Sequence, residues 1–416
     1  RALLTAVFQP FEAMTEFALP DAIVDRTADS KIVLLVLDGL GGLPHPDHGL
    51  TELEAAKTPH LDALAARSSL GMHLPIAPGV TAGSGPAHLA LFGYDPVQYQ
   101  VGRGLLSALG VGLELVEGDV AVRLNLATLD SEGRVTDRRA GRPSDAEGTR
   151  IVTKLVYQIQ APSGVEVILK PVKEHRAVLV LRGEGLDAQI DDTDPQETGV
   201  PPLKAAALAP SAAHTATLVQ DVIDQAVEIL GDEETINGIL ARGFARFDGF
   251  PSFENRFGLR GVAIAKYPMY RGVARLVGMS VGGIPTDDAS TVTVAEEQVG
   301  DFDFLFLHFK APDARGEDGN FEAKVAAIEA IDELIPRVEA LNPDVILVTG
   351  DHSTPATYAA HSWHHVPVLL ASKWARPTAS EFGERTCRSG DLGAVRGMDL
   401  MSLALAHAGR LEKFGA

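Results

Sequence analysis

The sequence predicts an α/β fold in which a mostly parallel sheet is covered by helices on both faces, with a smaller α/β domain inserted into it. Three observations lead to this prediction. First, several strand-like segments are continuously apolar instead of alternating between apolar and polar residues. Second, helical patterns lie between these segments. Third, the middle of the 416-residue chain has shorter strand patterns separated by polar loops. A chain of this length also exceeds what one hydrophobic core usually needs, which favours two domains.

The clearest strand patterns are apolar runs rich in β-branched and aromatic residues. They read KIVLLVLDG (31–39), DFLFLHFKAPD (303–313) and DVILVTGDH (344–352), and VPVLLAS (366–372) supplies a further strand. Runs without alternation are typical of strands that are buried on both faces. Because helical segments alternate with these runs, we expect the strands to pair in parallel.

Two helices carry recognisable start signals. The segment TPHLDALAARS (58–68) has Thr58 as a candidate N-cap and Pro59 at the first helical position, and Asn320 is the candidate N-cap of a later helix. Pro336 is expected to kink or end that later helix, because proline lacks the amide hydrogen that an α-helix needs.

The middle of the chain is expected to form the inserted domain. Its strand candidates are DVAVRLNLATL (119–129), HRAVLVLRG (175–183) and RGVAIAKYP (260–268), and a long helical pattern lies near 214–230. We therefore predict an inserted domain at 115–275 and a discontinuous main domain at 30–114 and 276–416. Residues 1–29 carry no motif that we can assign.

Composition argues against two classes of partner. The formal net charge of −20 repels polyanions, so nucleic acid is not expected to bind and any phosphate site must be a local pocket. No apolar run approaches the roughly 20 residues that a membrane helix requires. The single Cys387 cannot form an internal disulfide, and we therefore expect a cytoplasmic protein.

Acidic residues follow three of the strand-like runs, namely Asp38, Asp313 and Asp351. Ligands of open α/β sheets bind beyond the carboxyl ends of strands, so these acids can converge. His352 and His361 add nitrogen donors, and the mixed set is one that Mn²⁺, Zn²⁺ or Mg²⁺ accepts. The alternative is an ordinary turn, in which Asp351 caps, His352 packs and HSWHH is a surface loop.

Ser84 in VTAGSGPAHLALFGYDP lies between a loop of small residues and a helical pattern. A helix N-terminus there would present free amides to an anion. Serine at such a place is often a plain N-cap. Because Ser84 does not lie in a Gly-x-Ser-x-Gly elbow and the chain contains no Walker-type loop, a nucleophile at Ser84 would need activation by a metal ion.

An arginine-rich loop, DRRAGRP (137–143), stands out in an acidic protein. Its members Arg138, Arg139 and Arg142 could clamp a small anionic substrate, because the planar guanidinium matches carboxylate and phosphate oxygens two at a time. A solvated loop that balances local acids is the alternative. Lys266 and Arg103 are further candidates for substrate binding.

Eight motifs together resemble those of one enzyme family. They are VLDGLGG, LEAAKTPHLDALA, GSGPAHLALFGYDP, GRGLLSALG, DRRAGR, KAPDARGEDG, TGDHSTP and HSWHHVP. The chain resembles, from about residue 31 to the terminal KFGA, the archaeal-type 2,3-bisphosphoglycerate-independent phosphoglycerate mutases of the alkaline phosphatase superfamily. The resemblance implies an alkaline-phosphatase-like catalytic domain, an inserted substrate domain, and interconversion of 2- and 3-phosphoglycerate in glycolysis or gluconeogenesis.

The resemblance also implies two divalent metal ions and no 2,3-bisphosphoglycerate cofactor. One ion would be held by Asp38, Ser84, Asp351 and His352, and the other in part by Asp313 and His361. Ser84 would attack the phosphoryl group and form a phosphoserine. Asp137 is the candidate that moves protons between the two substrate hydroxyls, while Arg138 and Arg142 would hold the substrate carboxylate.

One position departs from the family pattern. Relatives usually have a histidine after the aspartate that corresponds to Asp313, whereas this chain has Glu317. A glutamate ligand would favour Mn²⁺ or Mg²⁺, with Zn²⁺ or Co²⁺ as alternatives, and His364 could compensate if Glu317 does not bind.

Two other functions stay open at this point. A metal-dependent phosphohydrolase or another phosphotransferase could use the same metal residues, because those residues do not decide whether the acceptor is water or an alcohol. A non-catalytic binding protein is the third alternative. The sequence does not indicate an oligomeric state.

Overall fold

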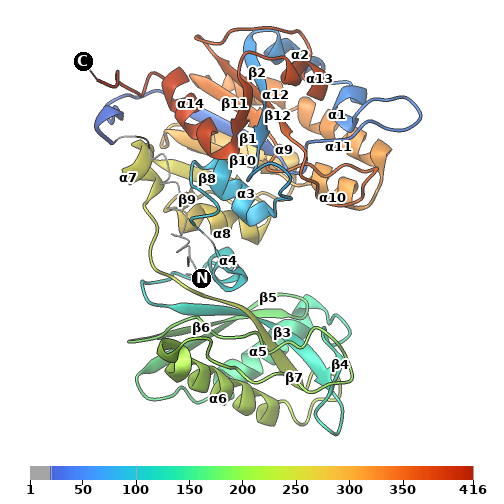
Figure 1. Ribbon diagram of the computed structural model, residues 1–416, viewed down its shortest axis with the longest axis vertical. Coiled ribbons are helices and arrows are strands. Elements are labelled where there is room, and N and C mark those ends of the chain that lie inside the picture. Colours follow the sequence, from blue (N-terminus) through green and yellow to red (C-terminus); the bar gives the residue numbers. More distant parts are fainter. Residues whose placement is uncertain (1–18, 20, 100, 416) are drawn as a thin grey trace, which may run out of the picture.

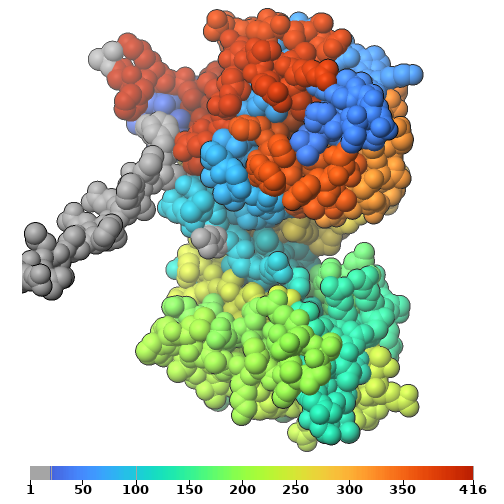
Figure 2. Space-filling view, turned by 45° about the vertical axis from the view of Figure 1, so that its right-hand side comes forward, coloured from blue at the N-terminus to red at the C-terminus, as the bar shows by residue number. Residues whose placement is uncertain are grey.

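The computed structural model describes residues 19, 21–99 and 101–415, which form two lobes. The larger lobe contains an eight-stranded sheet and the smaller one a five-stranded sheet (Figure 1). In the space-filling view the lobes meet at a narrower waist (Figure 2). No helix among the described residues is both long enough and apolar enough to cross a membrane.

The larger sheet has the strand order β13-β2-β12-β11-β1-β10-β8-β9. In that order the strands are Gly393–Arg396, Ser68–Leu74, Val366–Ser372, Val345–Thr349, Ile32–Leu37, Phe304–Phe309, Gly261–Ala265 and Ser280–Val281. β1 pairs in parallel with both β10 and β11, as expected. The expectation is wrong for β12, which is antiparallel to β11 and β2. No helix lies between β11 and β12, so the chain lacks the crossover that parallel pairing needs.

Strand β1 shows why the sequences of the central strands do not alternate between apolar and polar residues. All of its side chains are buried, but they enter two different cores on the two faces of the sheet. Ile32, Leu34 and Val36 pack on one face, whereas Val33, Leu35 and Leu37 pack on the other. A strand covered on both sides has no polar face, as predicted.

Helices cover both faces of the larger sheet (Figure 1). They are α1 (Glu52–Ala55), α2 (Pro59–Ala65), α3 (Ser84–Leu91), α4 (Arg103–Gly110), α7 (Phe253–Phe257), α8 (Pro268–Leu276), α9 (Asp288–Gln298), α10 (Ala311–Glu317), α11 (Phe321–Asp332), α12 (Ile335–Ala340), α13 (Glu384–Arg388) and α14 (Leu400–His407). Short 3-10 turns lie at Asp21–Ile23, Pro210–Ala212 and Gly397–Asp399.

The predicted helix signals have mixed outcomes. Asn320 caps α11 by accepting from the amide of Ala323, and α11 ends before Pro336, as expected. Thr58 is the N-cap residue of α2 and Pro59 is its first residue, as expected, but the side chain of Thr58 makes no capping hydrogen bond. Asp332 from α11 accepts from the first free amides of α2 instead, because a carboxylate also satisfies these donors.

The smaller lobe is an antiparallel sheet with helices on one face. Its elements are β3 (Val120–Leu129), β4 (Val135–Asp137), β5 (Val165–Lys173), β6 (Arg176–Gly183), β7 (Gly238–Arg246), α5 (Asp145–Gln158) and α6 (Ala213–Ile229). Val122 and Leu124 of β3 pack in one core with Ile151 of α5 and Val219 of α6. The face turned away from these helices is therefore the one available to a ligand.

The predicted end of the inserted domain is too late in the chain. Strand β8 pairs with β10 in the larger sheet, so residues 261–265 belong to the main lobe rather than to a domain ending at 275. The pattern RGVAIAKYP does not reveal this, because β8 and β10 become neighbours only in three dimensions.

Helix α4 lies between the two lobes and touches both (Figure 1). A Cβ atom at Gly104 would lie 2.2 Å from the backbone oxygen of Ala121 in β3. On the other side, a Cβ at Gly272 of α8 would lie 2.8 Å from the backbone oxygen of Leu106. Glycine is therefore required at both positions for the close approach of α4.

Candidate active site

The three acids predicted at strand exits converge in the larger lobe. Asp38 follows β1, Asp313 lies in α10 after β10, and Asp351 follows β11, and each is fully buried. His352 lies next to two of them: its Nε2 is 3.2 Å from Oδ2 of Asp351 and 3.6 Å from Oδ1 of Asp38. These three residues form one group that could hold a metal ion.

A second group lies on the other side of His352. Nε2 of His361 is 3.4 Å from Oδ1 of Asp313, and Nδ1 of His352 is 4.0 Å from the same oxygen. The two imidazole rings stack with their centroids 3.7 Å apart. Asp313, His352 and His361 thus form a second candidate metal group.

The donor atoms of the first group fit a cation. Among the described residues, Oδ1 of Asp38 and Oδ2 of Asp351 are buried and accept no hydrogen bond. Burial, and then the neighbouring charge of Asp38, raise the pKa of Asp351 well above its ordinary value. A buried pair of carboxylates is costly without a counter-charge, and a divalent metal ion supplies one.

The hydrogen bonds of His352 define its tautomer. Thr354 Oγ1 lies 2.6 Å from the Asp313 carboxylate, to which it donates, and 3.0 Å from Nδ1 of His352. The hydroxyl therefore accepts from Nδ1, which leaves the lone pair on Nε2. Burial lowers the pKa of His352 to about 4, so the ring is neutral at pH 7. The free Nε2 is the atom that can bind a metal ion.

Ser84 is placed against this nitrogen. Its Oγ lies 3.2 Å from Nε2 of His352. The N-cap of α3 is Gly83, and Ser84 is the first helical residue, so the alternative of a plain N-cap is wrong. The hydroxyl is therefore not used for capping and faces the first metal group.

Sequence reasoning missed four residues around the carboxylates. His308 Nε2 and Lys310 Nζ each lie 3.1 Å from Oδ2 of Asp38, and the hydroxyl of Tyr270 donates to the same oxygen. His88 Nδ1 is 3.4 Å from Asp351. A polar residue inside the apolar run of β10 was the available signal for His308.

Lys310 connects the two metal groups. Its ammonium donates to Asp313 as well as to Asp38. Burial opposes the charge, but the two carboxylates raise the pKa of Lys310 above its ordinary value. Burial also opposes the charge of Asp38, whose pKa is nevertheless held well below the ordinary value by His308 and Lys310. The centre therefore combines the ionised carboxylate of Asp38 with a fixed cation.

Glu317 and His364 differ in their position relative to the second group. Oε1 of Glu317 lies 3.6 Å from Nε2 of His361, and the side chain is 56% exposed. His364 instead hydrogen-bonds to Ser362 through Nδ1 at 3.0 Å and stacks on Trp363. The structure thus brings Glu317, and not His364, next to the second group.

The predicted substrate loop lies in the smaller lobe. Asp137 accepts hydrogen bonds from the amides of Arg139 and Gly141, and Arg138 pairs with Asp194 at 2.8 Å. Arg139, Arg142, Lys266 and Arg103 are exposed. No hydrogen bond or ion pair joins residues 137–143 to the metal groups in the described part of the chain.

A cluster of arginines on the smaller sheet was also missed. Arg123 of β3 lies opposite Arg242 of β7, and Asn125 lies opposite Arg176 of β6. Because side chains two residues apart share a face of a strand, all of these point to the same side. Burial, and then the charges of Arg176, Arg103 and Arg242, lower the pKa of Arg123 to about 10.

This arginine face has unused hydrogen-bond donors. Within the described residues, Nε of Arg123 and Nε of Arg242 are buried and make no hydrogen bond, although Arg242 forms ion pairs with Asp192 at 3.6 Å and Asp194 at 3.3 Å. The neighbouring Ala121 packs with α4 rather than with α5 and α6. In Figure 1, α4 lies between the lobes, so the face is turned toward the larger lobe. Clustered cations with free donors are suited to an anionic ligand.

Comparisons with known proteins agree with this geometry. Residues 65–237 match the model of a family described as 2,3-bisphosphoglycerate-independent phosphoglycerate mutase. A relative from Thermus thermophilus, named a probable enzyme of that type, is 52% identical over 391 residues, which cover 93% of this chain and 96% of the relative. The chain belongs to this family. The predicted enzyme class, an isomerase, is therefore confirmed.

Further relatives have the same fold. A similarly named protein from Thermotoga maritima is 48% identical over 388 residues, covering 93% of this chain and 96% of the relative. A solved protein from Pyrococcus horikoshii has a TM-score of 0.80 at 31% identity, covering 94% of this chain and 100% of its own. A cofactor-independent phosphoglycerate mutase from Thermoplasma acidophilum has a TM-score of 0.74 at 29% identity, with 91% and 100% covered. The predicted mixed α/β fold with a mostly parallel sheet is confirmed.

Proposed function

We propose that this family member interconverts 2- and 3-phosphoglycerate, without 2,3-bisphosphoglycerate, through a phosphoserine at Ser84. The observation that carries the proposal is the position of Ser84 Oγ, 3.2 Å from His352 Nε2 and beside two groups of buried metal-ligand side chains. Both the family name and the geometry support transfer of a phosphoryl group rather than another chemistry.

Two divalent ions would be held by these groups. Asp38, Ser84, Asp351 and His352 are assigned to one ion, and Asp313, Glu317 and His361 to the other. When bound, such cations lower the pKa of a hydroxyl and neutralise charge on a phosphoryl group. The carboxylate-rich sets favour Mn²⁺ or Mg²⁺, and the histidines allow Zn²⁺ or Co²⁺.

Ser84 and Asp137 would make and break the phosphorus–oxygen bonds and move the protons. Ser84 Oγ releases its proton to solvent and forms a bond to phosphorus while the bond from phosphorus to the glycerate oxygen breaks. That oxygen takes a proton, and we assign Asp137 as the group that donates it. The glycerate then presents its other hydroxyl, and the same steps run in reverse. For Asp137 to act, the smaller lobe must approach the metal groups.

The arginine face is assigned to the anionic substrate. Arg103, Arg123 and Arg242 would bind the carboxylate or phosphate, because the buried Nε of Arg123 makes no hydrogen bond and Arg242, although it is paired with Asp192 and Asp194, lies opposite Arg123. Arg138 is already paired with Asp194, so its predicted contact with substrate would require that pair to open. Arg139, Arg142 and Lys266 stay as further candidates at the exposed surface.

One assay separates this function from the phosphohydrolase alternative. The protein is loaded with Mn²⁺ and given 3-phosphoglycerate without 2,3-bisphosphoglycerate, and 2-phosphoglycerate and free phosphate are measured in parallel. We expect 2-phosphoglycerate with little released phosphate. Phosphate release at the rate of substrate loss would instead support hydrolysis, and neither product would support a non-catalytic role.

A further inference from the structure

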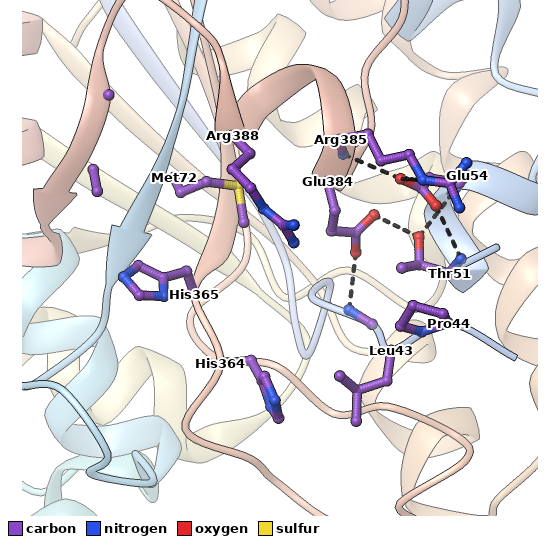
Figure 3. A pocket seen from close by; sticks show the side chains of 13 residues that line it. Leu43, Pro44, Thr51, Glu54, Met72, His364, His365, Glu384, Arg385 and Arg388 are labelled. Carbon is purple, nitrogen blue, oxygen red and sulfur yellow. Dashed lines mark hydrogen bonds and ion pairs between the residues drawn. The ribbon is translucent and has the colours of Figure 1, made fainter. Parts of the chain in front are cut away.

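The larger lobe contains a cavity of about 330 Å³ that none of the ligands assigned to the two metal ions lines, although the alternative ligand His364 does (Figure 3). It lies between α13, strands β2 and β13, the loop that follows β1 and the loop that precedes β12. Its lining residues are Gly42, Leu43, Pro44, Thr51, Glu54, Met72, His364, His365, Glu384, Arg385, Arg388, Gly393 and Ala394. The volume falls in the range of small-molecule pockets, which is about 300 to 1,000 Å³.

The carboxylates of this cavity already have partners. Glu384 is buried and accepts from the hydroxyl of Thr51 and, at 3.0 Å, from the amide of Gly42. Glu54 accepts from the amides of Thr51 and Arg385, and it lies 3.5 Å from the guanidinium of Arg385. These acids therefore do not need a cation from outside.

Arg388 is the group without a partner. Arg388 is exposed at the mouth of the cavity, its guanidinium makes no hydrogen bond or ion pair with any residue that the structure describes, and Figure 3 shows it pointing into the cavity. The ring of His365, which is also exposed and also lines the cavity, likewise has no hydrogen bond within the described residues. Leu43, Pro44 and Met72 supply an apolar wall.

We propose that this cavity is a second binding site for a small organic anion, separate from the phosphoglycerate site. The planar guanidinium of Arg388 would bind its carboxylate or phosphate oxygens, and His365 would donate a further hydrogen bond. The short apolar body of the ligand would lie against Leu43, Pro44 and Met72. Free donors on one wall and apolar atoms on another are the usual composition of a small-molecule site.

The bound anion would contact two loops that also carry residues of the candidate metal groups. Leu43 follows Asp38 along the same loop, and His364 and His365 follow His361. The backbone oxygens of His364 and His365 lie 3.2 and 3.3 Å from Oγ of Ser353, the neighbour of His352. The second site therefore shares two loops with the metal groups but none of the side chains that are assigned to the two ions.

Binding is tested with two short probes that differ in their anionic group. Butyrate tests a carboxylate ligand and methyl phosphate tests a phosphate ligand, and 1-butanol serves as the uncharged comparison. Titration calorimetry is run on the intact wild-type protein and on Arg388→Gln. We expect at least one anion to bind the wild type and to bind Arg388→Gln about tenfold or more weakly, as loss of a charge-assisted hydrogen bond implies.

Two matched variants locate the site. Arg376→Gln removes an exposed arginine paired with Asp391 on the same lobe and should leave binding unchanged. Arg123→Gln alters the proposed phosphoglycerate site and should also leave it unchanged. Equal binding to the wild type and to Arg388→Gln would overturn the proposal. Loss of binding in Arg123→Gln would also overturn it, and so would the failure of both anions to bind the wild type. Isomerase activity of Arg388→Gln should equal that of the wild type.

Discussion

Replacing Glu317 with alanine separates a metal ligand from an ordinary surface acid. Its carboxylate is 56% exposed and lies 3.6 Å from His361 Nε2. An exposed pair of this kind contributes about 0 to 1 kcal/mol to folding stability. If Glu317 binds the second metal ion, its loss should weaken metal affinity by at least about 10- to 100-fold, the range for losing even an outer partner of a metal ligand.

Folding stability and metal content should therefore change by different amounts in Glu317→Ala. We expect urea unfolding of Glu317→Ala without metal to match the wild type within about 1 kcal/mol. Metal analysis should show one of the two ions reduced, with the ion at Asp38, Asp351 and His352 retained. Glu317→His should restore occupancy and shift the preference from Mn²⁺ or Mg²⁺ toward Zn²⁺ or Co²⁺, because imidazole is a softer donor.

A control variant makes the result specific. Glu322→Ala removes an exposed glutamate in the first turn of α11 and should change neither metal content nor metal preference. Full metal content and an unchanged preference in Glu317→Ala would refute the assignment of Glu317. His364 or a water molecule would then have to complete the second site.

Three further predictions follow from the site and its surroundings. Ser84→Ala should abolish isomerisation and phosphoserine labelling while keeping most of the bound metal, because it removes the acceptor but only one of several ligands; measurable turnover would reject the mechanism. Arg123→Gln should lower kcat/KM about ten- to more than a hundredfold through lost contact with substrate, whereas the half-buried Arg134→Gln, away from the arginine face, should not; equal values for both would reject the arginine face as the substrate site. Lys324→Met should lower the free energy of unfolding, measured by urea titration, by about 3 to 5 kcal/mol. The reason is that the fully buried ammonium lies 3.8 Å from Glu52 and donates to two backbone oxygens. A loss below about 1 kcal/mol would show that the site repacks.

The metal groups were predictable from sequence because their positions follow from simple rules. Unalternating apolar runs indicated the central strands, and acids at their carboxyl ends indicated convergence. Asp38, Asp313 and Asp351 do converge, although Asp38 and Asp351 are separated by most of the chain. Ser84 needed the family resemblance as well, since a serine before a helical pattern is usually a cap.

The arginine face could not be predicted in the same way. Arg123, Arg176 and Arg242 come from three separate strands, and only the antiparallel register places them on one face. The arginines that are adjacent in sequence, Arg138 and Arg139, are instead divided between an internal ion pair and solvent. Clustering in sequence therefore pointed to the same lobe as the arginine face but to a different set of side chains.

The order of strands in the larger sheet has a consequence for synthesis of the chain. β1 pairs with β10 and β11, which the ribosome adds only after the whole smaller lobe. The smaller sheet uses residues from one continuous stretch, so we expect it to fold first. Until β10 and β11 emerge, IVLLVL is an unpaired apolar strand of the kind that promotes aggregation. Nascent chains that end between the smaller lobe and β10 should therefore depend on chaperones, whereas the isolated smaller lobe should not.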